Sequence, residues 1–447
     1  MATQIPTSFP TPAPILRKGL VVVIVSLLLL IPITMLRGLI SERIRLADQA
    51  EATVAAGWGG AQQVSGPIMV IPVRHRIRNG RGQVQEHMGF VFTLPDTLHI
   101  DAQLETESRR LGIYTVPVYQ SRLSIEARFL PTDLAPLVRL VDAGQQVFWE
   151  QAQLLLPVSE VKGIRALEAA RWNDQALRFV GGSYPQHNGV RAAIDVARLR
   201  DGEPASFGVD LTVAGSELLQ FLPLARTTDV AMGADWADPG FSGNYLPAER
   251  EISAAGFSAR WQVLELNRDY PQSWTDEAAV SHEQLSKSAF GVRLHLPADI
   301  YQRNERSMKY ALLFIVMTFA SLFLLEHLAG PELHAVQYAL VGLALSIFFL
   351  LLLALSEHIG FDLAYWLGTA ALAGLIGVYL GGALRSRVRG WGAAAAVLLL
   401  YSLLFVILNA AETALLIGAL SLFALLAAVM TITRKVDWNS ISRETTI

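Results

Sequence analysis

Six long apolar runs lie along the chain, one near the start and five after Met308, with a far more polar stretch between them. A helix needs about 20 mostly apolar residues to cross roughly 30 Å of hydrocarbon, and the runs are close to that length. The pattern therefore predicts six transmembrane helices, over residues 19–40, 310–329, 335–355, 363–383, 391–408 and 413–433.

The first run has the features of an uncleaved anchor. It is longer than the apolar core of a secretory signal, and it is followed by Arg37, Arg43 and Arg45 where a signal peptide would have small residues at a cleavage site. Residues 1–18 before it include the Pro-rich stretch "IPTSFPTPAP", which cannot hold a helix. We therefore expect a membrane helix that stays attached.

The polar stretch, residues 41–308, has mostly the pattern of β-strands. Short segments alternate apolar and polar residues and end at Pro, Gly, Asp or Ser, which is typical of antiparallel β-structure. The clearest are residues 84–95, 97–106, 112–119, 121–130, 205–224 and 250–266. We predict a hairpin that turns at Ala214, Gly215 and Ser216, and one short helix over 162–172. The predicted fold class is an α+β membrane protein with a large, mainly β domain inserted after the first of six helices.

Composition and charge fit this organisation. The chain is 52% hydrophobic and 17% charged, whereas soluble domains have about 25% charged residues. Basic residues of short loops favour the cytoplasmic side, and the pattern places both termini there and the β domain in the periplasm. The chain has no cysteine, so this domain needs no disulfide. The basic residues that decide the orientation are Arg17, Lys18, Arg385, Arg387, Arg389, Arg434 and Lys435. The five later spans form a bundle over 309–433, and 434–447 is a cytoplasmic tail.

Two groups of residues are candidates for functional contacts. Glu357 and His358 end the predicted third span; the pair either marks the water boundary or docks the β domain or a partner. Arg74, Arg76 and Arg78 alternate, so on a strand they share one face, and Arg81 lies in the turn beyond. Guanidinium groups suit phosphate and carboxylate, so this row is either a solvated hairpin face or a site for anionic headgroups or envelope polysaccharide.

The sequence offers little support for several other functions. Mid-span charges are absent from the five later spans, which counts against a proton-driven carrier but leaves a passive channel or a lipid-handling protein open. Ser159 and Lys162 fit a loose S-x-x-K pattern, but the surrounding elements and gaps do not match a penicillin-interacting serine enzyme. We expect no metal, no cofactor and no nucleic acid. The sparse candidates for a channel lining are Thr318, Ser321, Gln337, Ser346 and Asn409.

Several stretches, in order, resemble the CreD family of bacterial inner-membrane proteins. They are "GPIMVIPV" at Gly66, "RRLGIYTVPVY" at Arg109, "GNYLPAEREISAAGFSARW" at Gly243, "KYALLFIVMTFASLFLLEHL" at Lys309 and "LHAVQYALVGLALSIFFLLLLALSEHIGF" at Leu333. The resemblance implies an inner-membrane protein with a periplasmic domain, associated with a two-component system and envelope stress. It implies no catalytic residues. An LPAxRE-type segment maps to residues 246–251 and an SEH segment to 356–358.

We therefore predict a non-enzymatic inner-membrane protein that supports envelope integrity by binding an envelope component or partner through its β domain. The expected partners are membrane lipids, an envelope polysaccharide, a periplasmic or membrane protein, or a second copy of the chain. A passive channel or lipid-handling transporter is the alternative, and an unrecognised envelope enzyme is a third.

Overall fold

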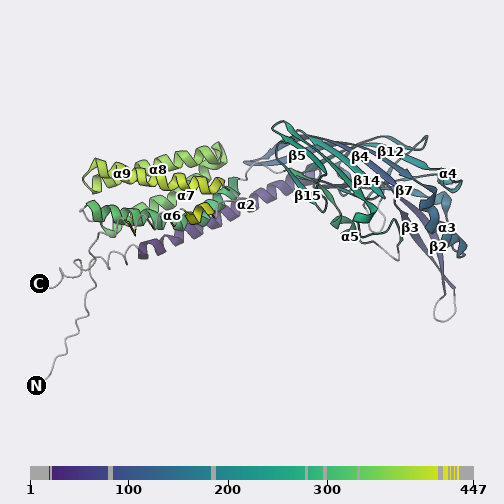
Figure 1. Ribbon diagram of the computed structural model, residues 1–447, viewed down its shortest axis with the longest axis horizontal. Coiled ribbons are helices and arrows are strands. Elements are labelled where there is room, and N and C mark those ends of the chain that lie inside the picture. Colours follow the sequence, from purple (N-terminus) through teal and green to yellow (C-terminus); the bar gives the residue numbers. More distant parts are fainter. Residues whose placement is uncertain are drawn as a thin grey trace, which may run out of the picture. The chain divides into compact units, whose positions relative to one another are not determined.

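The computed structural model describes residues 20, 23–78, 84–182, 188–276, 280–294, 300–329, 333–410 and 416–420, with 423, 427, 430 and 431. The side chains of residues 75–78, 84–85, 282 and 323–329 lie outside the described structure. The chain forms two compact units (Figure 1). The helical unit consists of Met1–Leu46 and Ala298–Ile447, and the β-rich unit consists of Ala47–Pro297. The β-rich unit is thus shorter than the predicted 41–308, because helices extend further at both of its ends.

Long helices build the helical unit: α2 (Leu30–Trp58), which runs on into the β-rich unit, α6 (Ile300–Ala329), α7 (Ala335–Ile359), α8 (Phe361–Ala383) and α9 (Arg387–Asn409). Four stretches of the described residues are long and apolar enough to cross a membrane: Val23–Trp58, Ala335–Ile359, Phe361–Ala383 and Arg387–Asn409. They cover the predicted spans at 335–355, 363–383 and 391–408 and most of 19–40, whose helix continues to Trp58 instead of ending at residue 40. The predicted span 310–329 lies within α6, which is not among the four, and 413–433 falls mostly outside the described residues.

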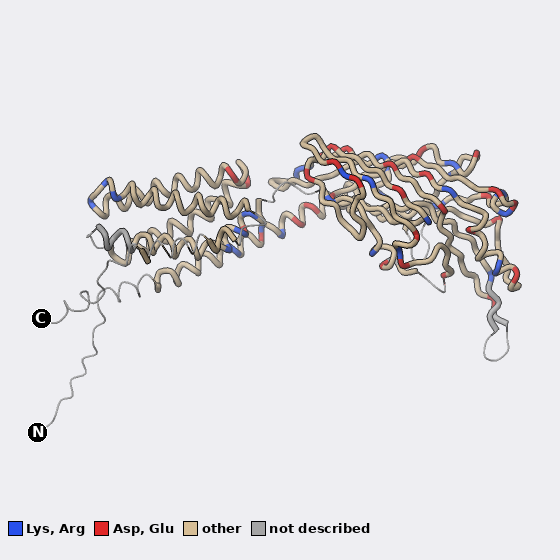
Figure 2. Tube along the Cα trace, viewed as in Figure 1, with Lys and Arg blue, Asp and Glu red and all other residues tan. Residues whose placement is uncertain are grey.

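Small residues let α8 and α9 pack closely. A Cβ atom added to Gly390 of α9 would lie 2.5 Å from the carbonyl oxygen of Gly377 and 2.6 Å from the Cα of Gly381, both on α8. These atoms belong to the backbone and cannot move aside, so the contact requires glycine. Charged residues lie near the ends of α7, α8 and α9 and leave the middles of these helices uncharged (Figure 2).

The β-rich unit contains three sheets within the described residues. The eight-stranded sheet has the order β16-β17-β14-β4-β5-β12-β8-β9, the seven-stranded sheet β10-β11-β7-β2-β3-β18 with β6 beside β2, and the four-stranded sheet β1-β13-β19-β15. The strands are β1 (Gln62–Ser65), β2 (Ile68–Arg78), β3 (Val84–Thr93), β4 (Thr97–Leu111), β5 (Tyr114–Phe129), β6 (Gln146–Val147), β7 (Gln153–Pro157), β8 (Ile164–Trp172), β9 (Gln175–Ala176), β10 (Val180–Gly181), β11 (Gly189–Ala193), β12 (Ala205–Ser216), β13 (Leu218–Leu222), β14 (Thr227–Ala234), β15 (Pro239–Gly243), β16 (Glu249–Ser253), β17 (Gly256–Leu264), β18 (Ser273–Thr275) and β19 (Phe290–Leu294). Short helices α3 (Ala135–Asp142), α4 (Ala197–Arg200) and α5 (His282–Lys287) connect them.

The eight-stranded sheet has one buried and one polar face. Over residues 97–105 of β4 and 121–129 of β5 buried and exposed residues alternate, as a half-buried strand requires. Ile100 lies directly opposite Ile125 and beside Val230, and all three are fully buried. Each such side chain stabilises the fold by about 1.5–3 kcal/mol. The alternate residues form what we call the outer face, which carries polar and charged groups.

One arginine binds three carboxylates at an end of this sheet. Arg226, just before β14, lies 2.9 Å from Glu265, 3.0 Å from Asp96 and 3.3 Å from Asp133. The side chain of Asp133 is fully buried and accepts a hydrogen bond from the backbone N–H of Leu130 at 2.7 Å. Burial raises the pKa of Asp133, and the backbone hydrogen bond and Arg226 act in the opposite direction.

Two local predictions were wrong. Residues 162–172 do not form a helix, because β8 pairs with β12 over this stretch. The register shifts between Gly208 and Asp210, and Ala169 has a φ of +50°, so the extra residue of a bulge breaks the two-residue alternation. A bulged strand and a short helix then have similar apolar spacing. The predicted hairpin at Ala214–Ser216 is also absent: β12 and β13 belong to different sheets, and the chain passes between them at Glu217, whose φ is +58°.

Candidate functional site

The end of α7 carries Glu357 and His358, and their side chains lie in different surroundings. The side chain of Glu357 is only 10% exposed; it accepts a hydrogen bond from the hydroxyl of Tyr301 at 3.3 Å and lies 3.5 Å from Nε of Arg43. His358 is exposed, and Gly360, with a φ of +80°, ends the helix just after it. The contacts that position Glu357 therefore come from α2 and α6, within the helical unit. Docking of the β-rich unit by this pair stays a prediction.

Glu357 belongs to a polar layer at one end of the bundle, which we call the junction cluster. Asn304 donates a hydrogen bond to the buried hydroxyl of Ser356 at 3.0 Å, and Arg303 pairs with Asp362 at 2.8 Å. Arg43 comes shortly before Leu46 and Tyr301 shortly after Ala298, where the chain leaves and re-enters the helical unit. Glu357 thus contacts both connecting helices next to these two points. The full cluster is Arg43, Tyr301, Arg303, Asn304, Ser356, Glu357 and Asp362.

The predicted arginine row lies in β2. Arg74 pairs across the sheet with Met88, Arg76 with Glu86 and Arg78 with Val84. The described side chain, that of Arg74, lies 3.5 Å from Glu86 and 5.2 Å from the ring centre of Phe148. Its guanidinium therefore already has a carboxylate and an aromatic partner. The side chains of Arg76 and Arg78, and all of Arg81, lie outside the described residues.

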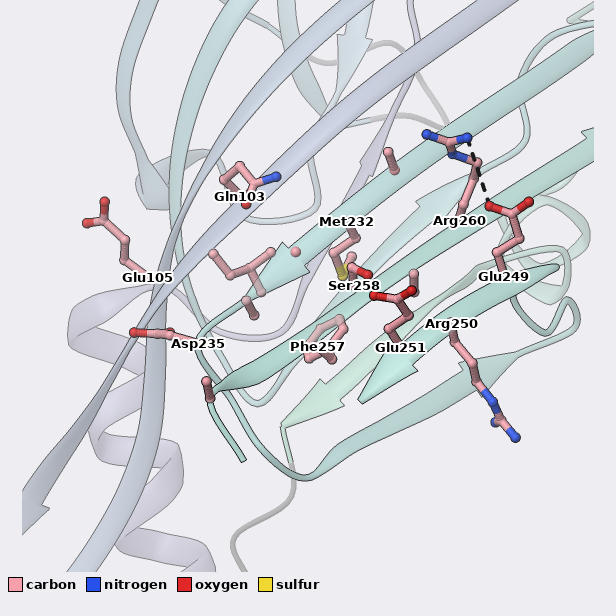
Figure 3. Close-up of a pocket in the computed structure, with 16 residues that line it drawn as sticks. Gln103, Glu105, Met232, Asp235, Glu249, Arg250, Glu251, Phe257, Ser258 and Arg260 are labelled. Carbon is pink, nitrogen blue, oxygen red and sulfur yellow. Dashed lines mark ion pairs between the residues drawn. The ribbon is translucent and has the colours of Figure 1, made fainter. Parts of the chain in front are cut away.

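The outer face contains an open pocket of about 730 Å³, which we call the acidic pocket (Figure 3). Strands β16, β17, β14 and β4 form it, and the side chain of Arg250 points away from the other labelled charged groups (Figure 3). Arg250 lies 5.8 Å from the ring centre of Phe241. The remaining charges are four carboxylates against one guanidinium, so the pocket favours cations. Its charged lining residues are Glu105, Asp235, Glu249, Arg250, Glu251 and Arg260.

Partners within the sheet hold most of these carboxylates. Asp235 accepts hydrogen bonds from the backbone N–H and the hydroxyl of Thr106, at 2.9 and 2.8 Å. Glu105 pairs with Arg122 at 2.7 Å, and Glu249 lies 4.0 Å from Arg260. Glu251 has no ion-pair partner among the residues that the structure describes, and it lies across from Ser258.

A second pocket of about 440 Å³ opens elsewhere on the outer face, between β4, β5, β8 and β12. Its lining includes Arg128, Arg171 and Arg198 with Glu126 and Asp174. Arg171 pairs with Glu126 at 3.6 Å and Arg198 with Asp174 at 3.9 Å, both at exposed positions. We call it the arginine pocket, and its excess of guanidinium groups gives it the opposite charge preference to the acidic pocket.

These outer-face residues were missed by sequence reasoning. The alternation of polar residues along 97–106 and 250–266 was visible and predicted exposed faces. The order of the strands was not, so residues as far apart as Glu105 and Glu251 could not be placed in one pocket.

Other sequence candidates make local contacts. Each of the hydroxyls of Thr318, Ser321 and Ser346 donates to a carbonyl one turn earlier in its own helix. Ser159 donates to the carbonyl of Ala61 and accepts from the N–H of Gln63. Among the described residues no group of three or more His, Cys, Asp or Glu side chains could hold a metal ion.

Comparison with known proteins places the chain in a family. The profile of the family described as "Inner membrane protein CreD" matches residues 14–439. The chain belongs to the CreD family. It is 33% identical over 423 residues to the Inner membrane protein CreD of Escherichia coli (strain K12), covering 93% of this chain and 92% of that one. A crystal structure of an M1 zinc metallopeptidase from Deinococcus radiodurans aligns with 38% of each chain at 12% identity, with a TM-score of 0.19.

Membership of the CreD family agrees with the apolar helices, and the structure now places the two segments that mark the resemblance. Residues 246–251 lead into and begin β16, and the side chains of Glu249 and Glu251 face the acidic pocket (Figure 3). Residues 356–358 end α7 and contribute Ser356 and Glu357 to the junction cluster. Both CreD segments therefore lie at the polar sites described above.

Proposed function

We propose that this CreD-family protein is a six-span inner-membrane protein with both termini in the cytoplasm and the β-rich unit in the periplasm. In this proposal the β-rich unit binds an envelope component or a partner, without catalysis, and so supports envelope integrity under stress. The observation that carries it is the outer face of the eight-stranded sheet. One face of this sheet is packed core, whereas the other is polar and carries two open pockets of opposite charge preference.

The junction cluster supports a link between binding and the membrane helices. Glu357 contacts α2 and α6 close to the two points where the chain passes to the β-rich unit. A change in either connecting helix would therefore alter contacts of one carboxylate at the end of α7. In this proposal, binding to the β-rich unit changes the conformation of the helix bundle through the contacts of Glu357 with α2 and α6.

Complementation tests the proposal. In a strain that lacks the protein, we would express the variant Glu249→Ala/Glu251→Ala/Arg260→Ala at native level and score sensitivity to detergent. The matched control is Glu203→Ala, an exposed carboxylate in a turn outside both pockets. We expect loss of protection from the triple variant alone, at normal membrane abundance. Full protection by the triple variant would contradict binding through this face.

The arginine row remains a proposal for anionic headgroups or polysaccharide. Arg74 contacts Glu86, and the test is made at the two other arginines of β2, Arg76 and Arg78, whose side chains lie outside the described residues. The protein with Arg76→Ser/Arg78→Ser should lose preference for anionic over neutral liposomes. Equal binding of the two liposome types by the unchanged protein would remove this proposal.

A lipid-handling function is the second candidate, because an apolar groove of about 270 Å³ runs between α7 and α8. Leu343, Ile347 and Gly368 are among its lining residues. Its test is crosslinking to a photoactivatable phospholipid. The variant Ala371→Leu fills the groove and should lower the yield, whereas Ala395→Leu, at an exposed position of α9, should not. The same yield from both variants would argue against a specific lipid site.

A further inference from the structure

Strand β16 is an exposed edge of the eight-stranded sheet. It is the first strand in the sheet order, and within the described residues it pairs with β17 alone. All five of its residues are exposed, including Ile252 at 52%. Edge strands present unpaired backbone N–H and C=O groups that another extended chain can join.

The hairpin geometry shows which backbone groups are free. Ser253 and Gly256 flank a two-residue turn, so they form a hydrogen-bonded pair, and such pairs alternate along an antiparallel ladder. Glu249, Glu251 and Ser253 therefore bond to β17. The N–H and C=O groups of Arg250 and Ile252 point to the free edge.

The side chains indicate what could join this edge. Glu249 and Glu251 face the acidic pocket, and Ile252 exposes an apolar side chain on the opposite side. A complementary strand would carry basic residues on the pocket side and apolar residues on the other, because directly opposed charges of opposite sign stabilise a strand pair. A second copy of β16 fits poorly, since pairing the five residues antiparallel with themselves places Glu251 opposite Glu251.

We propose that β16 is a docking edge for an extended basic segment of a partner polypeptide, which adds as a further strand beside the acidic pocket. This inference rests on the proposed binding function of the β-rich unit and names the chemistry of the partner. Main-chain hydrogen bonds to Arg250 and Ile252 would supply affinity, and the carboxylates of the acidic pocket would supply specificity.

The test measures binding of short labelled peptides to the full-length protein in detergent micelles by fluorescence anisotropy. One peptide alternates Lys and Val, and its matched control alternates Glu and Val. The variant Ile252→Pro removes an outward N–H that β17 does not use, so the sheet should tolerate it. Ile252→Ala is its control, because it shortens the side chain and keeps the N–H. Thermal unfolding of both variants verifies that they fold.

We expect the Lys–Val peptide to bind at least about tenfold more tightly than the Glu–Val peptide, and Ile252→Pro to weaken it about tenfold more than Ile252→Ala. Equal binding of both peptides, or equal effects of the two variants, would overturn the inference. So would a dimer of the unchanged protein that Ile252→Pro dissociates, since the edge would then bind a second copy. The proposed function has its own test: it fails if the variant Glu249→Ala/Glu251→Ala/Arg260→Ala protects cells fully in the complementation assay.

Discussion

Breaking the contact between Glu357 and Arg43 should loosen α2 from the bundle. The perturbation is Glu357→Ala, which removes the ion pair with Arg43 and the hydrogen bond from Tyr301. The chain offers a close control in His358→Ala, because His358 is the next residue on α7 and is exposed.

The magnitude follows from burial. The side chain of Glu357 is 10% exposed and that of Arg43 is 37% exposed, so this pair lies between a surface ion pair, worth about 0–1 kcal/mol, and a buried one, whose disruption costs about 3–5 kcal/mol. A hydrogen bond to a charged group adds about 1.5–3 kcal/mol in well-formed geometry, and the 3.3 Å bond from Tyr301 is long. We therefore expect Glu357→Ala to lower the free energy of unfolding by about 2–3 kcal/mol, and His358→Ala to change it by less than about 0.5 kcal/mol.

The assay is SDS-induced unfolding in mixed micelles, arranged as a double-mutant cycle of Glu357→Ala with Arg43→Ala. The coupling energy should be about 1 kcal/mol, since solvent screens part of the attraction at Arg43. A coupling energy indistinguishable from zero, or equal losses for Glu357→Ala and His358→Ala, would refute the reasoning.

Three further predictions concern packing, an aromatic contact and pH. Gly390→Leu should destabilise the bundle by about 1–3 kcal/mol because α8 backbone blocks its side chain, whereas Gly392→Leu, which has open space, should be tolerated in the same SDS assay. Arg109→Ala should cost about 0.5–1 kcal/mol in thermal unfolding, because its guanidinium lies 3.7 Å from the ring centre of Trp58; no loss would contradict this. Burial raises the pKa of Asp133, so this carboxyl contributes most to stability below its unfolded pKa of about 4, and the contribution is lost as pH rises through its folded pKa. Asp133→Asn should therefore weaken the fall of the melting temperature with pH between about pH 4 and 7. The same pH dependence in the variant and the unchanged protein would contradict the raised pKa.

The elements that local pattern determines were predicted well. The apolar runs at 335–355, 363–383 and 391–408 became α7, α8 and α9, because length and apolarity alone decide such helices. The alternation in 97–106 and 121–130 became parts of β4 and β5. The predictions were wrong where a bulge near Ala169 in β8 interrupted the alternation, and where the turn at Glu217 led into a different sheet.

Contacts between residues that are far apart in the chain could not be predicted from the sequence. The pair at 357–358 was visible, but its separation into a packed Glu357 and an exposed His358 depends on Arg43 and Tyr301, which are far away in the chain. The acidic pocket likewise combines residues of four strands whose neighbours no local pattern specifies. The sequence could therefore predict exposed polar faces but not the sites that those faces form.

The parallel pairing of β4 with β14 also has a consequence for how the protein is made. Thr97 of β4 lies beside Thr227 of β14, so 130 residues must follow Thr97 in synthesis before its partner exists. At about 5–20 residues per second, β4 would wait roughly 7–26 s with one side unpaired. The β5 hairpin covers its other side early, and the open side must be kept from pairing with other chains until β14 arrives. Biogenesis of this unit therefore has a built-in delay, during which the growing chain is most vulnerable to aggregation and proteolysis.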